Sequence, residues 1–155
     1  FVNRLLAGKP LPITHPEMTR FLLPLSEAVG LVELALREGL QGDLFIRKSP
    51  AANVKTVVEG LESLFGRKVE REHIGIRHGE KMHETLATSE EMARAIDLGD
   101  HWRIPMDHRE LATGPVAKTP PFVSDKTEQL DPEGVARLLA SLPEFAPLLP
   151  QCTRR

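Results

Sequence analysis

Apolar residues recur at every third or fourth position in two long stretches of this chain, and that spacing predicts two amphipathic helices. The first helix is expected over residues 25–36, with Gly39 ending it in a left-handed conformation. The second is expected over residues 54–65, where Asn53 can cap the first turn and Gly66 can end the helix. Each helix should place its apolar stripe on strands of a sheet.

Two shorter runs, residues 43–47 and residues 69–77, lie before and after the second helix and predict strands. A strand, a helix and a strand in this order favour parallel pairing, because a parallel pair needs a crossover connection of about a dozen residues. The pattern therefore predicts an α/β fold class.

The last third of the chain carries more local signals. A helix is expected to begin at Ser89, and a short extended segment is expected at residues 102–105. Residues 113–129 contain several prolines without a sustained period, which predicts a surface loop or an arm that crosses to another surface. Asp131 and Pro132 then predict a helix start, because aspartate caps free amides and proline loses no hydrogen bond there. The buried face of this last helix is expected to contain Leu138, Leu139 and Leu142.

Composition excludes several protein classes. Of the 155 residues, 41% are hydrophobic and 27% are charged, and the formal net charge is -2, which is unlike a disordered tail, a fibre or a protein that binds nucleic acid by bulk charge. No apolar run approaches the roughly 20 residues of a membrane span. The single cysteine, Cys152, cannot form an internal disulfide. We therefore expect a cytoplasmic protein with no nucleic-acid or membrane partner.

The run from residue 74 to residue 81 holds the strongest candidate chemistry. It places Arg77 and Glu80 three residues apart on a glycine-containing turn after a strand-like segment. Arginine binds phosphate through a planar fork of donors, so Arg77 and Arg20 could together clamp one diphosphate, or both could form surface ion pairs. Glu80 could accept hydrogen bonds from ribose hydroxyls, or it could neutralise Arg77 or Lys81.

Two histidines near this turn raise the question of a metal site. His78 and His83 are five residues apart, which does not place both side chains on one helix face as in a zinc-binding H-E-x-x-H motif, and no cysteine lies near them. We expect no metal in this chain.

Four motifs occur in order along the chain: Met18 to Phe21, Gly42 to Ala51, Gly75 to Lys81 and Trp102 to Asp107. Together they resemble the C-terminal half of the bacterial polysaccharide-biosynthesis nucleotide-sugar dehydratases and epimerases, in the extended short-chain dehydrogenase/reductase (SDR) superfamily. The resemblance spans about residues 1–142. It is closest to the C5-inverting UDP-N-acetylglucosamine 4,6-dehydratases of capsule and O-antigen synthesis, whose genes are often labelled UDP-glucose 4-epimerase.

The resemblance favours a dehydratase over a plain epimerase at two places. His78 stands where the broader family often has proline, and the segments after Trp102 and after Asp131 are similar to a C-terminal extension that simple 4-epimerases lack. UDP-glucose or UDP-N-acetylglucosamine 4-epimerase is the alternative.

The implied fold is the C-terminal, substrate-binding portion of an extended Rossmann-type SDR fold plus a C-terminal extension, without the N-terminal Rossmann half. Residues 1–100 would form the substrate-binding part, residues 101–150 the extension and residues 151–155 a tail. Because some strands beneath the two main helices would belong to the absent half, we expect this chain to expose apolar surface. We also expect a homo-oligomer.

The resemblance assigns six residues to the UDP-sugar: Pro12, Ile13, Arg20, Arg77, His78 and Glu80. The two arginines would hold the diphosphate and Glu80 the ribose. The backbone around residues 11–13 would contact the uracil.

By the same resemblance, the whole enzyme oxidises the sugar at C4 with NAD(P), removes water across C5 and C6, and returns the hydride to C6. The cofactor would be bound mainly by the absent half, and the Tyr-x-x-x-Lys acid/base pair would lie upstream. Since the chain contains no tyrosine, that pair cannot lie in it, and we expect no catalytic residue here and no activity of the chain alone. Two other hypotheses stay open: a non-catalytic UDP-sugar-binding module, and an interaction domain with no small ligand.

Overall fold

The computed structural model describes residues 1–106 and 119–149. The helices are α1 (Val2–Leu6), α2 (Leu25–Glu38), α3 (Val54–Phe65), α4 (Ser89–Met92) and α5 (Pro132–Ala140). The strands are β1 (Leu11–Ile13), β2 (Thr19–Phe21), β3 (Leu44–Arg47), β4 (Ala51–Asn53), β5 (Arg71–His73), β6 (Thr85–Ala87), β7 (Ile96–Asp97), β8 (His101–Ile104) and β9 (Phe122–Val123). This mixture of helices and short strands confirms the α/β class.

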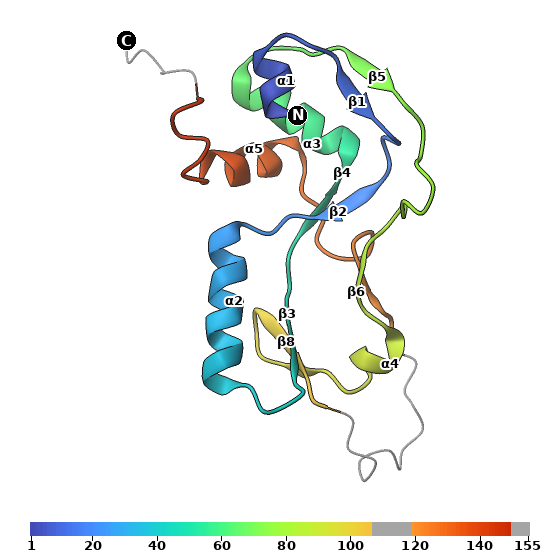
Figure 1. Cartoon of the computed structure of the whole chain (residues 1–155), viewed down its shortest axis with the longest axis vertical. Coiled ribbons are helices and arrows are strands. Elements are labelled where there is room, and N and C mark those ends of the chain that lie inside the picture. Colours follow the sequence, from blue (N-terminus) through green and yellow to red (C-terminus); the bar gives the residue numbers. More distant parts are fainter. Residues whose placement is uncertain (107–118, 150–155) are drawn as a thin grey trace.

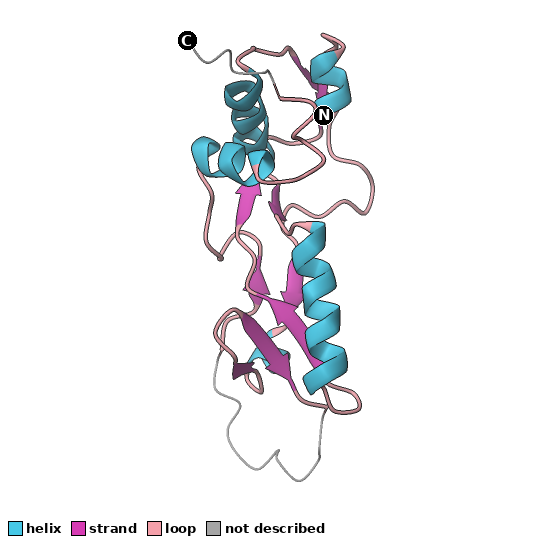
Figure 2. Cartoon of the chain, turned by 90° about the vertical axis from the view of Figure 1, so that its left-hand side faces the viewer, coloured by secondary structure: helices cyan, strands magenta, loops and turns pink. Residues whose placement is uncertain are grey.

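The molecule is elongated, and β2 and β4 connect its two ends (Figure 1). One end contains α1, α3 and α5 with the β1–β5 pair, and the other contains α2 beside the β3–β8–β7 sheet, as Figure 2 also shows. Three small clusters of buried residues form the core instead of one large centre. They are Leu5, Leu61 and Phe65; Leu11, Ile13 and Val58; and Ile46, Ala87 and Ile104.

Helix α3 has the ends that its sequence predicts. The side chain of Asn53 accepts a hydrogen bond of 2.7 Å from the Thr56 amide, and Gly66 ends the helix in the left-handed region at φ 64°. Midway along, Gly60 allows close contact with α5, because a Cβ at this position would lie 2.7 Å from Val135 Cγ1. Helix α3 contributes to two of the core clusters, Leu61 and Phe65 to the first and Val58 to the second.

The Asn53 cap supports a stability prediction. Asn53→Ala removes the acceptor for the Thr56 amide, and we expect the free energy of unfolding to fall by about 1 kcal/mol. Asn53→Ser keeps a capping oxygen and should recover most of that loss. Urea denaturation of the three proteins measures both values, and equal stability of wild type and Asn53→Ala would show that the cap contributes nothing.

Helix α5 begins as predicted, but its buried face differs. The Asp131 carboxylate accepts from the Gly134 amide at 2.6 Å, and proline occupies the first turn. Gly134 and Val135 are the buried residues, whereas the three predicted leucines, Leu138, Leu139 and Leu142, are partly buried, and of these Leu139 packs against the first core cluster. The reason is that α5 contacts α3 near its own first turn, where Val135 meets Gly60.

Helix α2 forms as predicted but ends differently. Gly39 is extended, at φ -75° and ψ 144°, so the predicted left-handed end is wrong. Glycine is still required there, because a Cβ would lie 2.4 Å from the Ala35 carbonyl oxygen.

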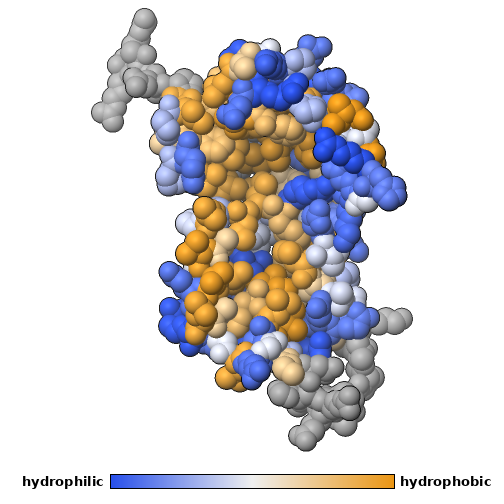
Figure 3. Space-filling view, in the orientation of Figure 1, coloured by the Kyte–Doolittle hydropathy of each residue, from blue (hydrophilic) through white to orange (hydrophobic). Residues whose placement is uncertain are grey.

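One face of α2 is exposed to solvent. Within the described part of the chain no residue of α2 is buried, and Leu25 and Leu36 are 71% and 82% exposed. Figure 3 shows apolar side chains gathered over this helix. Val29, Val32 and Leu40 extend the same face, each at least half exposed. The expected exposed apolar surface is therefore confirmed on α2, whereas α3 is covered by this chain's own residues.

The predicted strand pairing is wrong. Strand β3 forms, but it pairs antiparallel with β8, and the predicted run 69–77 shortens to β5, which pairs in parallel with β1. Gly75 ends β5 early, because it adopts φ 77°. Strands β3 and β5 thus belong to different sheets, and a further strand, β4, lies between β3 and α3.

The remaining elements agree in part with prediction. Helix α4 begins at Ser89 as predicted, with Thr88 capping it in a capping box with Glu91, and β8 confirms the extended segment. In the predicted loop, Phe122–Val123 instead pairs with β6 as strand β9. Residues 113–118 and the tail 151–155, including Cys152, lie outside the described residues.

Candidate functional site

A cavity of about 450 Å³ opens between β1, β2, the start of α3 and the turn after β5. Its charged rim contains Arg20, Arg77 and Glu80, and its apolar wall includes Met18, Val54 and Ile74. This volume is within the range of about 300–1,000 Å³ that small-molecule sites occupy.

The two predicted arginines reach this cavity from distant parts of the chain. Arg20 lies on β2, and Arg77 lies on the turn that follows β5. The parallel β1–β5 pair brings them together, because it continues into a hydrogen bond of 2.9 Å from the Ile74 amide to the Ile13 carbonyl and so holds the turn against β1. Both arginines therefore line one cavity, although they are far apart in the sequence.

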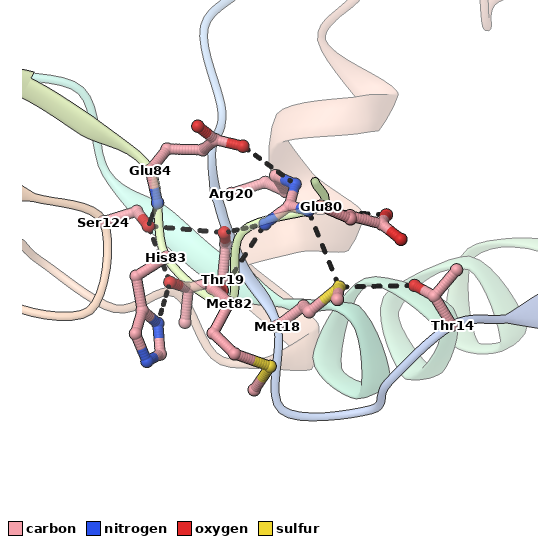
Figure 4. A network of polar contacts seen from close by, with 9 residues as sticks. All are labelled: Thr14, Met18, Thr19, Arg20, Glu80, Met82, His83, Glu84 and Ser124. Atoms are coloured by element: carbon pink, nitrogen blue, oxygen red, sulfur yellow. Dashed lines mark hydrogen bonds and ion pairs between the residues drawn. The ribbon is translucent and has the colours of Figure 1, made fainter. Parts of the chain in front are cut away.

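Protein contacts fix the Arg20 guanidinium in place (Figure 4). Its Nη1 donates to the Thr19 carbonyl at 2.8 Å and lies 3.4 Å from the Met82 carbonyl, and its Nη2 lies 3.6 Å from Met18 Sδ. With a side chain 32% exposed, Arg20 is both held and accessible.

Two carboxylates lie near Arg20 at ion-pair distances. Glu80 Oε1 is 3.7 Å from Arg20 Nη2, and Glu84 Oε1 is 3.5 Å from Arg20 Nε. The other oxygen of Glu80 accepts from the Arg77 amide at 3.2 Å. Glu80 therefore joins β2 to the turn, and it neutralises Arg20 and not the predicted Arg77 side chain or Lys81.

Arg77 differs from Arg20 in its contacts. Among residues 1–106 and 119–149, the Arg77 guanidinium makes no hydrogen bond or ion pair, although its backbone amide is bonded to Glu80. The cavity thus has one arginine that is partly neutralised and one that is available to an anion.

The other three predicted residues take different places. Pro12 lines the cavity, whereas the Ile13 side chain is 2% exposed and packs with Leu11 and Val58. Successive strand residues point to opposite faces, so Leu11 and Ile13 enter the core while Pro12 faces the cavity. His78 is exposed and is not part of the cavity lining. The structure does not bring the Ile13 side chain or His78 to the site, and their roles stay predictions.

Sequence reasoning missed most of the apolar wall. Val54 packs against the Leu11, Ile13 and Val58 cluster as part of the apolar stripe of α3, and from the first turn of the helix it also borders the cavity. Its position beside Asn53, at the helix start, was the available signal. Glu84 has no comparable signal, because its contact with Arg20 depends on how β2 and the segment before β6 lie together.

Other kinds of site find little support here. In the described ranges no three His, Asp, Glu or Cys residues gather as metal ligands, and no described helix is long and apolar enough to cross a membrane. The sequence has no G-x-G-x-x-G run, the glycine-rich turn that holds a dinucleotide pyrophosphate in Rossmann folds.

Comparisons with known proteins cover most of this chain. Residues 1–106 match the family described as Polysaccharide biosynthesis protein. Proteins named UDP-glucose 4-epimerase from Rickettsia canadensis and Rickettsia prowazekii are 44% and 43% identical over 150 residues, which is 92% of this chain and 44% of each relative. The X-ray structure of Pen from Bacillus thuringiensis superposes with a TM-score of 0.75 and 27% identity over 89% of this chain and 42% of that one. The chain spans less than half the length of these relatives.

Proposed function

Since the chain belongs to the polysaccharide biosynthesis protein family, we propose that it is the part of a nucleotide-sugar-modifying enzyme that binds the UDP moiety. The observation that carries this proposal is the cavity shared by Arg20 and Arg77. A diphosphate carries negative charge on both phosphates, and two guanidinium groups on one rim match it with planar forks of donors.

The cavity also suggests how the rest of UDP would lie. The diphosphate would occupy the space between the arginines, and the uracil would lie along the apolar wall toward the β1 backbone. As a phosphate oxygen approaches Arg20, it would replace Glu80, whose ion pair with Arg20 is long at 3.7 Å. The Glu80 carboxylate would then be available to accept a hydrogen bond from a ribose hydroxyl.

The reaction itself would take place with groups outside this chain. The chain lacks the glycine-rich G-x-G-x-x-G turn and the tyrosine of the expected acid/base pair. We therefore place the oxidation and proton transfers on the part that the relatives possess and this chain lacks. The role of this chain would be to hold the nucleotide.

For the whole enzyme we favour a UDP-sugar 4-epimerase, because the relatives carry the name UDP-glucose 4-epimerase. Their alignment covers 92% of this chain and so extends into the C-terminal segment. Proteins named UDP-glucose 4-epimerase therefore share this segment, and its presence does not favour a dehydratase over them. The UDP-N-acetylglucosamine 4,6-dehydratase expected from the sequence is the second candidate. The feature that still favours it is His78, at a position where the broader family often has proline.

Calorimetric titration of UDP into the 155-residue chain tests the proposed function. We expect one saturable site, weaker binding of uridine because the arginines then have no anion, and no turnover of UDP-glucose or UDP-N-acetylglucosamine. Absence of UDP binding would favour the interaction domain, and turnover by this chain alone would contradict the division of roles.

The reaction class needs the full-length protein. An epimerase would convert its UDP-sugar into a product of unchanged mass, and a dehydratase would give a product lighter by one water. Binding without any turnover by the full-length protein would support the non-catalytic module. Mass spectrometry of the nucleotide-sugar pool distinguishes these outcomes.

A further inference from the structure

We propose that Ser124, in the segment after the family match, is a positioning residue that sets the Arg20 guanidinium in the anion site through Thr19. This inference rests on the proposed function, because it assigns Arg20 to UDP binding. It gives the C-terminal segment a part in that site, although Ser124 does not line the cavity.

A short chain of three polar side chains, two of them buried, carries the proposal (Figure 4). Thr19 Oγ1 lies 2.6 Å from Ser124 Oγ and 2.8 Å from His83 Nδ1. Thr19 is 7% exposed and Ser124 is fully buried. Three segments that are distant in sequence meet in these two hydrogen bonds.

Ser124 also contacts the two backbone segments that lie next to the Arg20 side chain, one at Thr19 and one at Glu84. Its hydroxyl accepts from the Glu84 amide at 2.8 Å and lies 3.3 Å from the Thr19 carbonyl oxygen, and its own amide donates to the Glu84 carbonyl at 2.8 Å. The Thr19 amide donates to the Met82 carbonyl at 3.0 Å. Because the Thr19 and Met82 carbonyls are the acceptors for Arg20 Nη1, Ser124 connects the two backbones that orient the guanidinium.

The hydroxyl protons of Thr19 and Ser124 can be placed in two complete ways. Ser124 can donate to Thr19 while Thr19 donates to His83, or His83 can donate to Thr19, Thr19 to Ser124, and Ser124 to the Thr19 carbonyl. Every hydroxyl has a partner in either direction. Removing the Ser124 hydroxyl breaks both arrangements and leaves the partly buried Glu84 amide without its side-chain acceptor.

Further contacts hold Ser124 itself in place. The Gln129 side-chain amide donates to the Ser124 carbonyl at 2.8 Å, and strand β9, which ends at the preceding residue, pairs with β6. The pairing of β9 with β6 thus holds the turn that carries Ser124 beside the segment that contains Glu84. The Ser124 hydroxyl is therefore presented in one position toward Thr19.

Ligand titrations with hydroxyl variants test this role. Ser124→Ala and the near-isosteric Thr19→Val are each expected to weaken UDP binding to the chain about tenfold. Thr19→Ser keeps the hydroxyl and should bind UDP within about twofold of wild type. Thr127→Ala is the matched control, because the Thr127 hydroxyl donates to the Ser49 carbonyl and has no contact with Arg20.

A second ligand separates positioning from general loss of structure. Uridine lacks the diphosphate, so its affinity, measured by ligand-detected NMR, should be unchanged in Ser124→Ala and Thr19→Val. Equal losses for UDP and uridine would overturn the proposal, and so would unchanged UDP binding in both variants. If Ser124→Ala does not fold, the comparison of Thr19→Val with Thr19→Ser decides.

A double-mutant cycle distinguishes failure of this inference from failure of the proposed function. In an Arg20→Gln background, Ser124→Ala should cause no further loss of UDP affinity, because its effect acts through Arg20. Additive losses would contradict the positioning role. If Arg20→Gln alone leaves UDP binding unchanged, the proposed function itself is wrong.

Discussion

Replacing Arg77 by alanine is expected to weaken UDP binding about a hundredfold, which corresponds to about 3 kcal/mol. Among residues 1–106 and 119–149 its guanidinium has no other partner, so an anion binds it without first displacing a carboxylate. A bidentate, charge-assisted contact with phosphate is among the stronger hydrogen-bonded contacts in proteins. Titration calorimetry of wild type and Arg77→Ala measures the loss.

Two further variants make the Arg77 result specific. Arg77→Lys keeps the charge without the planar fork and should recover only part of the affinity. Arg37→Ala removes an exposed arginine that pairs with Glu38 on α2 and does not line the cavity, so UDP binding should not change. If Arg77→Ala binds UDP as tightly as wild type, the cavity is not the nucleotide site.

Replacing Glu62 by alanine is expected to lower the free energy of unfolding by about 2–3 kcal/mol. This carboxylate on α3 is 5% exposed, accepts from the Val69 amide at 3.1 Å, and pairs with Lys68 and Arg71 at 3.1 and 3.2 Å. Both cations keep access to water, with side chains 89% and 31% exposed, so the loss should be smaller than for a fully buried pair. Urea denaturation measures it.

Glu59→Ala is the matched control for Glu62. Glu59 lies on the same helix and pairs with the same arginine, but at 4.0 Å and with a side chain 31% exposed. Its replacement should change stability by no more than about 0.5 kcal/mol. Equal effects of the two substitutions would show that the buried position of Glu62 is unimportant.

The effect of Glu62 should also depend on pH. Burial raises the pKa of Glu62, but the Val69 hydrogen bond and the charges of Lys68 and Arg71 outweigh it, so the pKa lies below its ordinary value of 4.5. A lowered folded-state pKa means that this stabilisation is fully present above about pH 4.5 and is lost as the pH falls through the folded-state value. The stability difference between wild type and Glu62→Ala should therefore shrink in acid, and a constant difference would contradict this account.

The helices show how far prediction from local sequence reaches. Asn53 and Asp131 cap amides three residues away, and Gly66 adopts the conformation that glycine tolerates best. These contacts lie within one helical turn, so the residues that make them are neighbours in the sequence. The prediction of a left-handed end for α2 was wrong, because glycine is required at position 39 for close approach to the Ala35 carbonyl and not for a positive φ.

Strand pairing could not be predicted in the same way. The run of residues 69–77 was expected to pair with β3, yet β5 pairs with β1, a strand of three residues with little pattern. Hydrogen bonds between strands join distant segments, and nothing in the spacing of one strand specifies its partner. Despite the incorrect pairing, Arg20 and Arg77 line one cavity, because their selection used residue chemistry and family motifs and not the strand order.

The amino-acid order was thus sufficient for the two ends of α3, the start of α5, the α/β class and the choice of two arginines and Glu80 that line one cavity. Folding added the facts that depend on distant segments: the shared cavity, the Glu80–Arg20 pair, and the buried hydroxyl of Ser124 beside Thr19. The physical reason is range. Backbone preference and capping act within a few residues, whereas packing and strand hydrogen bonds decide which remote side chains meet.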